Sequence, residues 1–292
     1  MAAVVIAVID IGTNTTRLLV VEVEQGQLRP LVERRHFAAP GSEGPASSAQ
    51  LASLIESEAR HARDAGAEEL LVAGTAALRA AGVDEELQLA CSRAGAGEPR
   101  VLSEREEAEL AFLGATASVQ VAGAVAVADV GGGSTELAVG SVGEAPSWWA
   151  SRALGSRLLT EEALTSDPPS DEQMMHGRSL AGSMLDGLDP PGCESALAVS
   201  GGAASLRRLC GETLDRVTVE RTLRRLLASP SADVARELDL APERVRLVPA
   251  ALLILESIGK RLDTELRIAR GGMREGLALA RARELAGAGS GS

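Results

Sequence analysis

The sequence predicts an α/β protein made of two domains of related structure. Its 292 residues are enough for two domains that each bury a core of their own. Residues 5–16 (VIAVIDIGTNTT) and residues 124–135 (AVAVADVGGGST) align without a gap. Around both copies, short apolar segments alternate with amphipathic segments of helical period. We therefore expect one domain over residues 1–122, a second over residues 123–286, and a disordered tail over residues 287–292.

Each copy of the repeat predicts a β-hairpin. It begins as a run rich in Val or Ile, which is typical of a strand buried on both faces. The run ends at an acidic residue, Asp10 or Asp129, and a turn of Gly, Thr, Asn or Ser follows. Apolar residues resume at 18–21 and at 137–139. A single turn of this composition is common in hairpins and indicates no function by itself. Two matching turns, one in each half of the chain, indicate a shared function.

The remaining elements of the first half follow from hydrophobic period and turn residues. Residues 47–65 form an amphipathic helix in this prediction, and Gly66 ends it. The other expected elements, taken in order, are a strand at 69–72, a helix at 76–91, a strand at 101–103 and a helix at 104–117.

The second half repeats this mixture. A strand at 196–199 leads into the turn Ser-Gly-Gly, and a helix begins after it. Prolines at two places bracket a helical segment on the surface of this domain rather than a domain boundary; they are Pro168, Pro169, Pro190 and Pro191. The other expected elements are helices at 204–210, 219–228 and 250–261, a strand at 265–268 and a last helix from residue 274.

Charge and composition exclude several functions. A net charge of −12 argues against general binding to nucleic acid or to an anionic membrane. Aromatic residues make up only 1% of the chain, so stacking platforms for single-stranded nucleic acid are lacking. Lys260 is the only lysine, which excludes a P-loop nucleotide-binding site. Any phosphate must therefore be bound by arginine side chains and backbone N–H groups.

The cysteines and the N-terminus predict a cytoplasmic location. The three cysteines are far apart and form no C-x-x-C pair, which fits a reducing compartment. The N-terminal apolar run follows no basic segment and stops at Asp10, so we expect neither a signal peptide nor a membrane span. His36, His61 and His176 lie outside every motif, and we expect them on the surface or on helices.

The two repeated turns have the composition of phosphate-binding loops. Glycine lets the backbone approach a phosphate closely and point successive N–H groups at it, and Thr and Ser add hydroxyl donors. An Asp at the end of each strand can hold a hydrated metal ion or orient a water molecule. The candidate phosphate-binding residues are Gly12, Thr13, Asn14 and Thr15 in the first loop, and Gly131, Gly132, Gly133, Ser134 and Thr135 in the second.

Six segments together resemble the exopolyphosphatase and guanosine pentaphosphate phosphohydrolase family, in a short two-domain form. They are DIGTNTTRL at 10–18, GTAALR at 74–79, SEREEA at 103–108, DVGGGSTEL at 129–137, SGG at 200–202 and GGMREG at 271–276. The resemblance implies two actin-like domains (ribonuclease H-like, of the ASKHA superfamily) with an active-site cleft between them. It also implies hydrolysis of a terminal phosphoanhydride with Mg²⁺ or Mn²⁺ as cofactor.

The resemblance also implies roles for single residues. Glu107 takes the place of the family's catalytic base, although by composition alone it is one carboxylate among several on an acidic helix. Asp129 and Glu136, with Asp10 as a weaker partner, are the implied metal-associated acids. The implied substrate contacts, besides the two loops, are Arg17, Arg79, Arg274, Gly201 and Gly202.

Departures from the family pattern leave the substrate open. Glu104, Leu158 and Ala203 replace residues that are common in the family at these positions. The acidic net charge leads us to expect that short polyphosphate or guanosine pentaphosphate is handled at least as well as long polymer. Two alternatives remain: a phosphotransferase of the same superfold, and a non-catalytic sensor of guanosine tetraphosphate. A homodimer is also compatible with the sequence.

Overall fold

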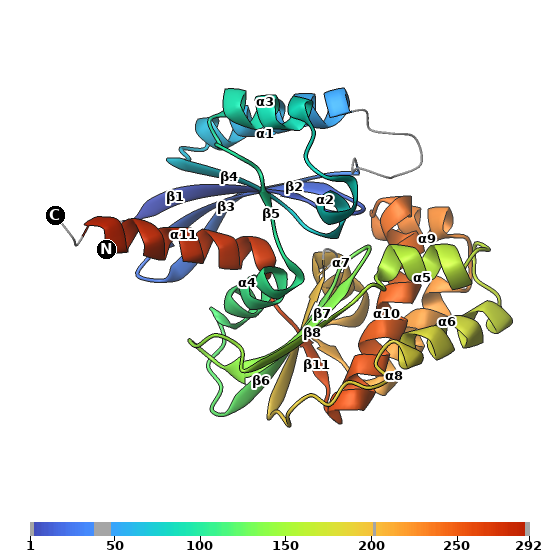
Figure 1. Ribbon diagram of the computed structural model, residues 1–292. Coiled ribbons are helices and arrows are strands. Elements are labelled where there is room, and N and C mark those ends of the chain that lie inside the picture. The colour runs from blue at the N-terminus through green and yellow to red at the C-terminus, as the bar shows by residue number, and fades with distance from the viewer. Residues whose placement is uncertain (1–2, 38–47, 201–202, 290–292) are drawn as a thin grey trace. The chain divides into compact units, whose positions relative to one another are not determined.

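The computed structural model describes residues 3–37, 48–200 and 203–289. The chain divides into two compact units, Met1–Val119 with Gly271–Ser292, and Gln120–Arg270 (Figure 1). Each unit is built around one mixed sheet with helices on it, so the expected α/β class is confirmed. Among the described residues, no helix is both long and apolar enough to cross a membrane.

The first unit contains a five-stranded sheet in the order β3-β2-β1-β4-β5. Strands β1, β2 and β3 form an antiparallel meander, and β4 and β5 continue the sheet parallel to β1. The predicted hairpin is β1 and β2. The strands span Val4–Ile11 (β1), Thr16–Glu24 (β2), Gln27–His36 (β3), Glu69–Gly74 (β4) and Arg100–Val101 (β5).

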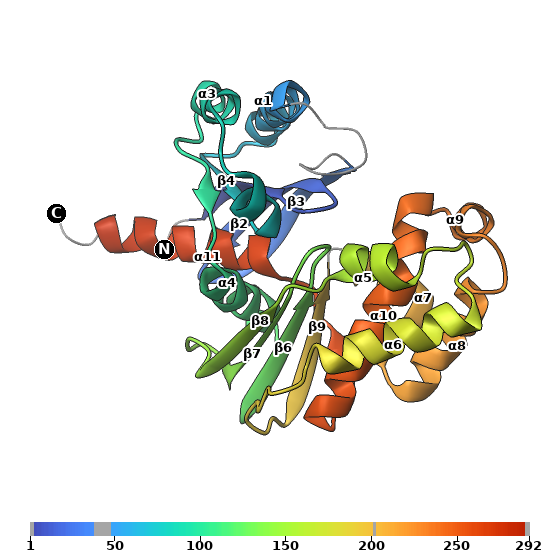
Figure 2. The same ribbon diagram turned by 45° about the vertical axis from the view of Figure 1, so that its right-hand side comes forward.

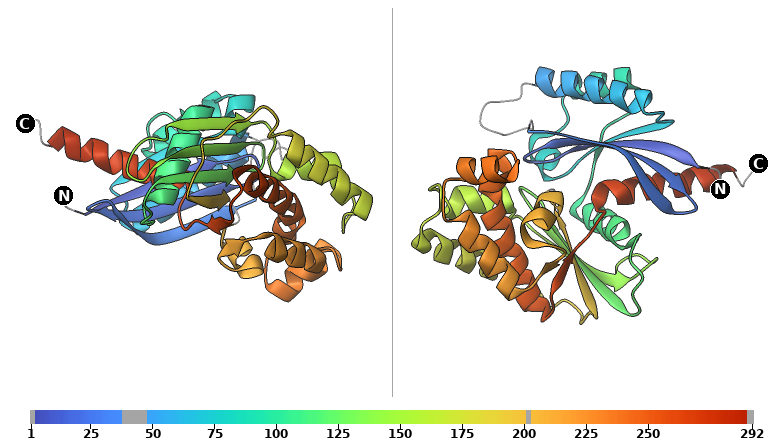
Figure 3. Two further views of the ribbon diagram at one scale, coloured as in Figure 1. Left: turned by 90° about the horizontal axis from the view of Figure 1, so that it is seen from below. Right: turned by 180° about the vertical axis from the view of Figure 1, so that it is seen from behind.

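Helices cover both faces of this sheet (Figures 1 and 3). Helices α1 (Ser48–Asp64) and α3 (Glu85–Ala94) pack on one face, where Ile55 and Cys91 join a core with Ile9 and Ile11. Helices α4 (Glu104–Thr116) and α11 (Met273–Gly289) pack on the other face, around Val8 and Leu277. The short helix α2 (Ala76–Ala81) follows β4.

The second unit repeats the strand order of the first. Its sheet runs β10-β11-β9-β6-β7-β8, with β6, β7 and β8 antiparallel and β9 and β11 parallel to β6. This repeated meander with parallel strands added at its first member is the topology of two actin-like domains. The strands span Ala124–Val130 (β6), Thr135–Ser141 (β7), Trp148–Arg152 (β8), Ser195–Ser200 (β9), Thr213–Leu214 (β10) and Leu266–Ile268 (β11).

One long helix, α10 (Pro242–Leu262), organises the core of the second unit. It is buried along most of its length and contacts α5, α6, α8 and α9 as well as β6 and β9 (Figure 2). The helices around it span Ser156–Ala163 (α5), Asp171–Ser183 (α6), Ala203–Cys210 (α7), Arg216–Leu226 (α8) and Ser231–Leu238 (α9).

Two helices differ from the prediction. The helix expected at 76–91 is interrupted, because Gly82 has a φ of 78° and Asp84 then caps α3 by accepting a hydrogen bond from the N–H of Leu87 at 2.8 Å. Helix α10 begins at Pro242 rather than near residue 250 and includes Pro249. Strands β3, β8 and β10 and helices α5 and α9 were not predicted.

The C-terminal helix also differs from the prediction. Residues 271–286 were assigned to the second domain, but α11 packs on α4, β1 and β2 of the first unit. Met273, Leu277, Ala278 and Ala282 fill the core on that face of the first sheet, which explains why the helix belongs there. The helix runs to Gly289, so the first residues of the expected disordered tail are helical, and residues 290–292 lie outside the described part.

Candidate active site

The two glycine loops adopt the same tight turn. In the first loop the N–H of Gly12 donates to the carbonyl of Thr15 at 3.0 Å, and in the second the N–H of Gly131 donates to the carbonyl of Ser134 at 2.9 Å. A Cβ at Gly12 would lie 3.2 Å from the Thr15 oxygen, and one at Gly131 would lie 3.1 Å from the Ser134 oxygen. The repeat seen in the sequence is therefore a repeat of backbone structure, and both turns favour glycine for the same reason.

The second loop is held in place by the start of α5. A Cβ at Gly155 would collide with the backbone of Gly132 and lie 2.6 Å from the nitrogen of Gly133. The N–H of Ser156 donates to the carbonyl of Gly131 at 2.9 Å, and the N–H of Arg157 donates to that of Gly132 at 3.0 Å. Sequence reasoning missed this support, for which the only signal was a glycine directly before a helix.

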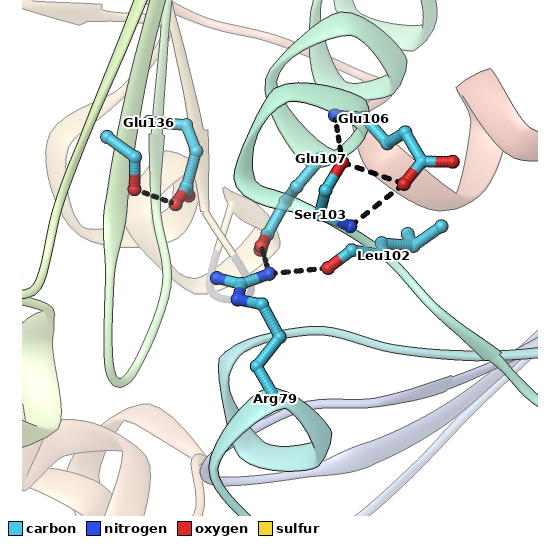
Figure 4. A network of polar contacts seen from close by, with 7 residues as sticks. Arg79, Leu102, Ser103, Glu106, Glu107 and Glu136 are labelled. Atoms are coloured by element: carbon cyan, nitrogen blue, oxygen red, sulfur yellow. Dashed lines mark hydrogen bonds and ion pairs between the residues drawn. The ribbon is translucent and has the colours of Figure 1, made fainter. Parts of the chain in front are cut away.

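Glu107 lies in the first turn of α4, behind a capping box. Ser103 and Glu106 form the box: the Ser103 hydroxyl accepts from the Glu106 N–H at 3.2 Å, and Glu106 accepts from the Ser103 N–H at 2.9 Å (Figure 4). The hydrogen bond from the Ser103 backbone is the main cause that lowers the pKa of Glu106. Carboxylates in this turn are also favoured by the partial positive charge of the helix N-terminus.

Arg79 holds the carboxylate of Glu107. Glu107 is 7% exposed, and the Nη1 of Arg79 donates to its Oε2 at 2.7 Å and to the carbonyl of Leu102 at 2.8 Å (Figure 4). A charged hydrogen bond of this length is strong, and breaking it leaves a charge in a site where water is scarce. The arginine that the sequence suggests as a substrate contact therefore lies against the predicted base.

Asp129 and Glu136 face each other across two strands. They are register partners on β6 and β7, so their side chains project from the same face of the sheet. Glu136 is 2% exposed, and the hydroxyl of Ser151, its partner on β8, donates to its Oε1 at 2.9 Å. Two carboxylates at such a pair repel each other, and a cation or a bound proton relieves the repulsion.

The donor set at Asp129 and Glu136 suits a hard cation that also binds its substrate. In the described part of the chain, no group of three His, Cys, Asp or Glu residues is arranged to hold a metal ion. Mg²⁺ is usually held by one or two carboxylates, with water and substrate phosphates completing its shell. The pair on β6 and β7 fits that mode and does not fit a closed structural metal site.

Asp10 and Arg17 occupy the equivalent pair in the first unit. Burial raises the pKa of the Asp10 carboxyl, and the charges of Arg17 and Arg274 oppose that rise. In the described part of the chain, its Oδ1 is buried and lacks a hydrogen-bond partner. The Nε of Arg17 donates to the Thr15 hydroxyl at 3.0 Å, which ties the arginine to the first loop.

The predicted residues are thus divided between the units. The first unit holds the first loop, Asp10, Arg17, Arg274 and the Glu107–Arg79 pair. The second unit holds the second loop with Asp129 and Glu136. Gly201 and Gly202 lie outside the described residues.

Comparisons with known proteins agree on one family. Residues 45–284 match the model of the Ppx/GppA phosphatase family. The chain is 29% identical to exopolyphosphatase 1 of Mycobacterium tuberculosis, covering 94% of this chain and 87% of that protein. It is 27% identical to the guanosine-5'-triphosphate,3'-diphosphate pyrophosphatase of Aeromonas hydrophila, over 93% of this chain and 58% of that protein. The Aquifex aeolicus family member matches in structure with a TM-score of 0.80 at 20% identity, over 97% of this chain and 99% of that one.

Proposed function

Because the chain belongs to the Ppx/GppA phosphatase family, we propose that it hydrolyses terminal phosphoanhydride bonds of short inorganic polyphosphate or of guanosine pentaphosphate. The observation that carries the proposal is the buried carboxylate of Glu107, fixed by Arg79 at 2.7 Å in the first turn of a helix. The relatives named exopolyphosphatase and guanosine-5'-triphosphate,3'-diphosphate pyrophosphatase support the choice of substrates.

Glu107 acts as the general base in this proposal. Arg79 engages one carboxylate oxygen, Oε2, and a carboxylate offers several lone-pair positions with which to orient a water molecule. As the water oxygen bonds to the terminal phosphorus, a proton passes to Glu107. The bond from that phosphorus to the bridging oxygen breaks, and the shortened phosphate leaves with the electron pair. Positioning of this kind contributes roughly 10²–10⁴-fold to the rate.

The two loops and the arginines bind the phosphates. Because the N–H groups of Gly12 and Gly131 bond within the turns, the backbone N–H groups that follow them in the two loops supply the donors, and the hydroxyls of Thr15 and Ser134 add to them. Arg17 and Arg274 neutralise charge on the substrate, since a guanidinium pairs with phosphate oxygens through two parallel hydrogen bonds. Asp10, the register partner of Arg17, is the weaker candidate for association with a metal ion.

Asp129 and Glu136 are the residues that we propose to hold a divalent cation, Mg²⁺ or Mn²⁺. Such an ion supplies charge neutralisation for the phosphates when bound. Ser151 keeps the Glu136 carboxylate oriented through its 2.9 Å hydrogen bond. The three cysteines are free thiols, which supports action in the reducing cytoplasm.

A phosphate-release assay separates this function from its alternatives. The purified chain, with Mg²⁺, is given polyphosphate of several lengths and guanosine pentaphosphate, with and without ADP. We expect phosphate release that does not depend on ADP, at least as efficient with short polyphosphate as with long polymer. ATP formed only when ADP is present would identify a phosphotransferase. Tight binding of guanosine tetraphosphate without any turnover would identify a sensor.

A further inference from the structure

A row of charged side chains crosses three strands of the first sheet next to the first glycine loop. Asp10 on β1 is the register partner of Arg17 on β2, and Arg17 is the register partner of Arg35 on β3. Directly opposite residues of antiparallel strands project from the same face. The row therefore extends from the end of β1 to the edge strand, and Arg35 lies one strand spacing, about 4.8 Å, beyond Arg17.

This row lies on the face of the sheet that carries α11. Val8 and Leu19 lie two residues along their strands from Asp10 and Arg17 and therefore project from the same face. Both share a core with Met273 at the start of α11. Arg274 follows Met273 directly, and its charge acts on both ends of the row. It works to lower the pKa of the Asp10 carboxyl, and after burial it is the next cause of the lowered pKa of Arg35.

The neighbours of Arg35 on its strand point the other way. Arg34 donates from Nε to both oxygens of Glu58 on α1, at 2.9 and 3.1 Å, and the Nε2 of His36 lies 3.2 Å from the same carboxylate. These two side chains are engaged on the α1 face. At this end of β3, Arg35 is the basic residue whose side chain belongs to the row beside the loop.

Three guanidinium groups, those of Arg17, Arg35 and Arg274, thus converge at one end of the unit. Acids are also near: Asp10, Glu33 on the same strand as Arg35, and Glu275, whose Oε1 lies 3.9 Å from Arg274. Arg35 is exposed to solvent although protein atoms crowd it enough to lower its pKa, so a ligand can reach it. A polyanion lying across the row would relieve the repulsion between the three positive charges.

We propose that Arg35 is a substrate-binding residue that contacts a phosphate group beyond the one held by the loop at residues 12–15, together with Arg17 and Arg274. The class of ligand rests on the proposed function, since a chain of linked phosphates is the anion that spans several arginines. Arg35 then contributes to affinity for chains of three or more phosphates and leaves the binding of a single phosphate unchanged.

Binding measurements test this subsite without any need for turnover. Titration calorimetry at low salt compares tripolyphosphate with inorganic phosphate for the wild type, Arg35→Gln and Arg29→Gln. Arg29 lies on the same strand and is exposed, with an ion pair to Glu22 at 2.8 Å, so its removal changes the net charge equally. We expect Arg35→Gln to weaken tripolyphosphate binding by at least about tenfold, the worth of one hydrogen bond to a charged group. The affinity of Arg35→Gln for inorganic phosphate should stay within about twofold of the wild type. The affinity of Arg29→Gln for both ligands should also stay within about twofold of the wild type.

Several outcomes would overturn the proposal. Tripolyphosphate binding by Arg35→Gln equal to that by Arg29→Gln would do so, as would an equal loss of phosphate and tripolyphosphate affinity. Arg35→Lys guards against a folding defect, because it keeps the charge and should retain intermediate affinity for tripolyphosphate. The proposed hydrolysis is judged separately. If tripolyphosphate binding depends on Arg35 but no phosphate is released, the hydrolase is refuted and the subsite stands. If Arg35→Gln releases phosphate normally with an unchanged KM for tripolyphosphate, the subsite is refuted and the hydrolase stands.

Discussion

At the scale of single residues, the contact between Arg79 and Glu107 gives the segment GTAALR at 74–79 a different role from the one that the sequence suggests. The sequence suggests that Arg79 binds phosphate, but the structure has it donate to Glu107 and to the carbonyl of Leu102. These residues come from α2, from the segment after β5 and from α4, and their contact depends on tertiary packing. No local pattern in the sequence carries that information.

Substitution of Arg79 distinguishes its two possible roles. Without Arg79 the Glu107 carboxylate loses the charged hydrogen bond that fixes it, which is worth about 1.5–3 kcal/mol, or roughly 10–100-fold in rate. Arg79→Gln should therefore lower kcat by that factor and leave KM within about threefold. Steady-state phosphate release measures both, with Arg105→Gln as the control, since Arg105 pairs with Glu109 on the surface of α4. A large rise in KM at constant kcat would show that Arg79 binds substrate instead.

The carboxylate pair on β6 and β7 predicts a metal requirement. Asp129→Asn should raise the Mn²⁺ concentration needed for half-maximal activity by at least about tenfold, because a neutral amide is a poorer ligand for a hard cation. Direct Mn²⁺ binding in the presence of tripolyphosphate provides a second readout. Glu144→Gln, at an exposed position in the same unit, is the matched control. Full activity of the wild type in excess chelator would refute the metal site.

At the scale of elements, close contact between α4 and α11 positions the helix that carries Glu107. A Cβ at Gly114 would collide with the carbonyl of Gly272, and one at Gly276 would collide with that of Leu110. The two helices therefore approach at backbone distance, which only glycine permits at these positions. The segment GGMREG is thus also a packing motif for the first unit.

Gly114→Ala should force α4 and α11 apart. Overpacking of this kind costs about 1–3 kcal/mol of folding free energy, and a displaced α4 should lower kcat as well. Gly182→Ala in α6 is the control, because a Cβ there meets nothing within 4 Å and alanine should stabilise the helix by up to about 1 kcal/mol. Denaturant unfolding of both variants measures the difference. A Gly114→Ala protein as stable and active as the wild type would contradict the close packing.

Helices α6 and α10 are joined by an ion pair whose strength depends on pH. Burial works to raise the pKa of Glu256, but hydrogen bonds from Lys260 at 2.8 Å and Arg178 at 3.0 Å outweigh it, so the pKa is lowered below 4.5. Because the pKa of Glu256 is lower in the folded than in the unfolded protein, its ion pair stabilises the fold when the pH is above the unfolded pKa. This stabilisation is lost as the pH falls through the pKa of Glu256 in the folded protein. Glu256→Gln should be less stable than the wild type at neutral pH. It should also lose less unfolding free energy than the wild type between roughly pH 5 and pH 3. An unchanged slope of unfolding free energy against pH would contradict this.

The sequence predicted the elements that local patterns define. Both hairpins, the helices α1 and α4 and the strand β4 appear where apolar period and turn residues place them. The break after α2 was missed because Gly82 lies in an otherwise helical pattern, although Asp84 offered a capping signal. The edge strand β3 is rich in charge and half-exposed, so its sequence lacks a clear apolar period. His36 and His61 appeared to be isolated, but in the fold both approach the buried Glu58.

At the scale of the whole molecule, the proposed site residues are divided between two units whose sheets follow the same strand order. The first holds the proposed base Glu107, the arginine that contacts it, and the row of Asp10, Arg17 and Arg35. The second contributes the carboxylate pair and a second glycine turn of the same structure. The predicted boundary near residue 122 lies close to the division at Val119, whereas the assignment of the last helix depended on long-range packing that the sequence does not reveal.

Phosphate release from Glu107→Gln tests whether this chain hydrolyses phosphoanhydrides with Glu107 as its base. Glu109→Gln is the control, since Glu109 lies on the same helix and pairs with Arg105 on the surface. We expect a loss of roughly 10²–10⁴-fold in kcat for Glu107→Gln, with tripolyphosphate still bound, and near-normal turnover for Glu109→Gln. Turnover by Glu107→Gln within a few fold of the wild type would contradict it.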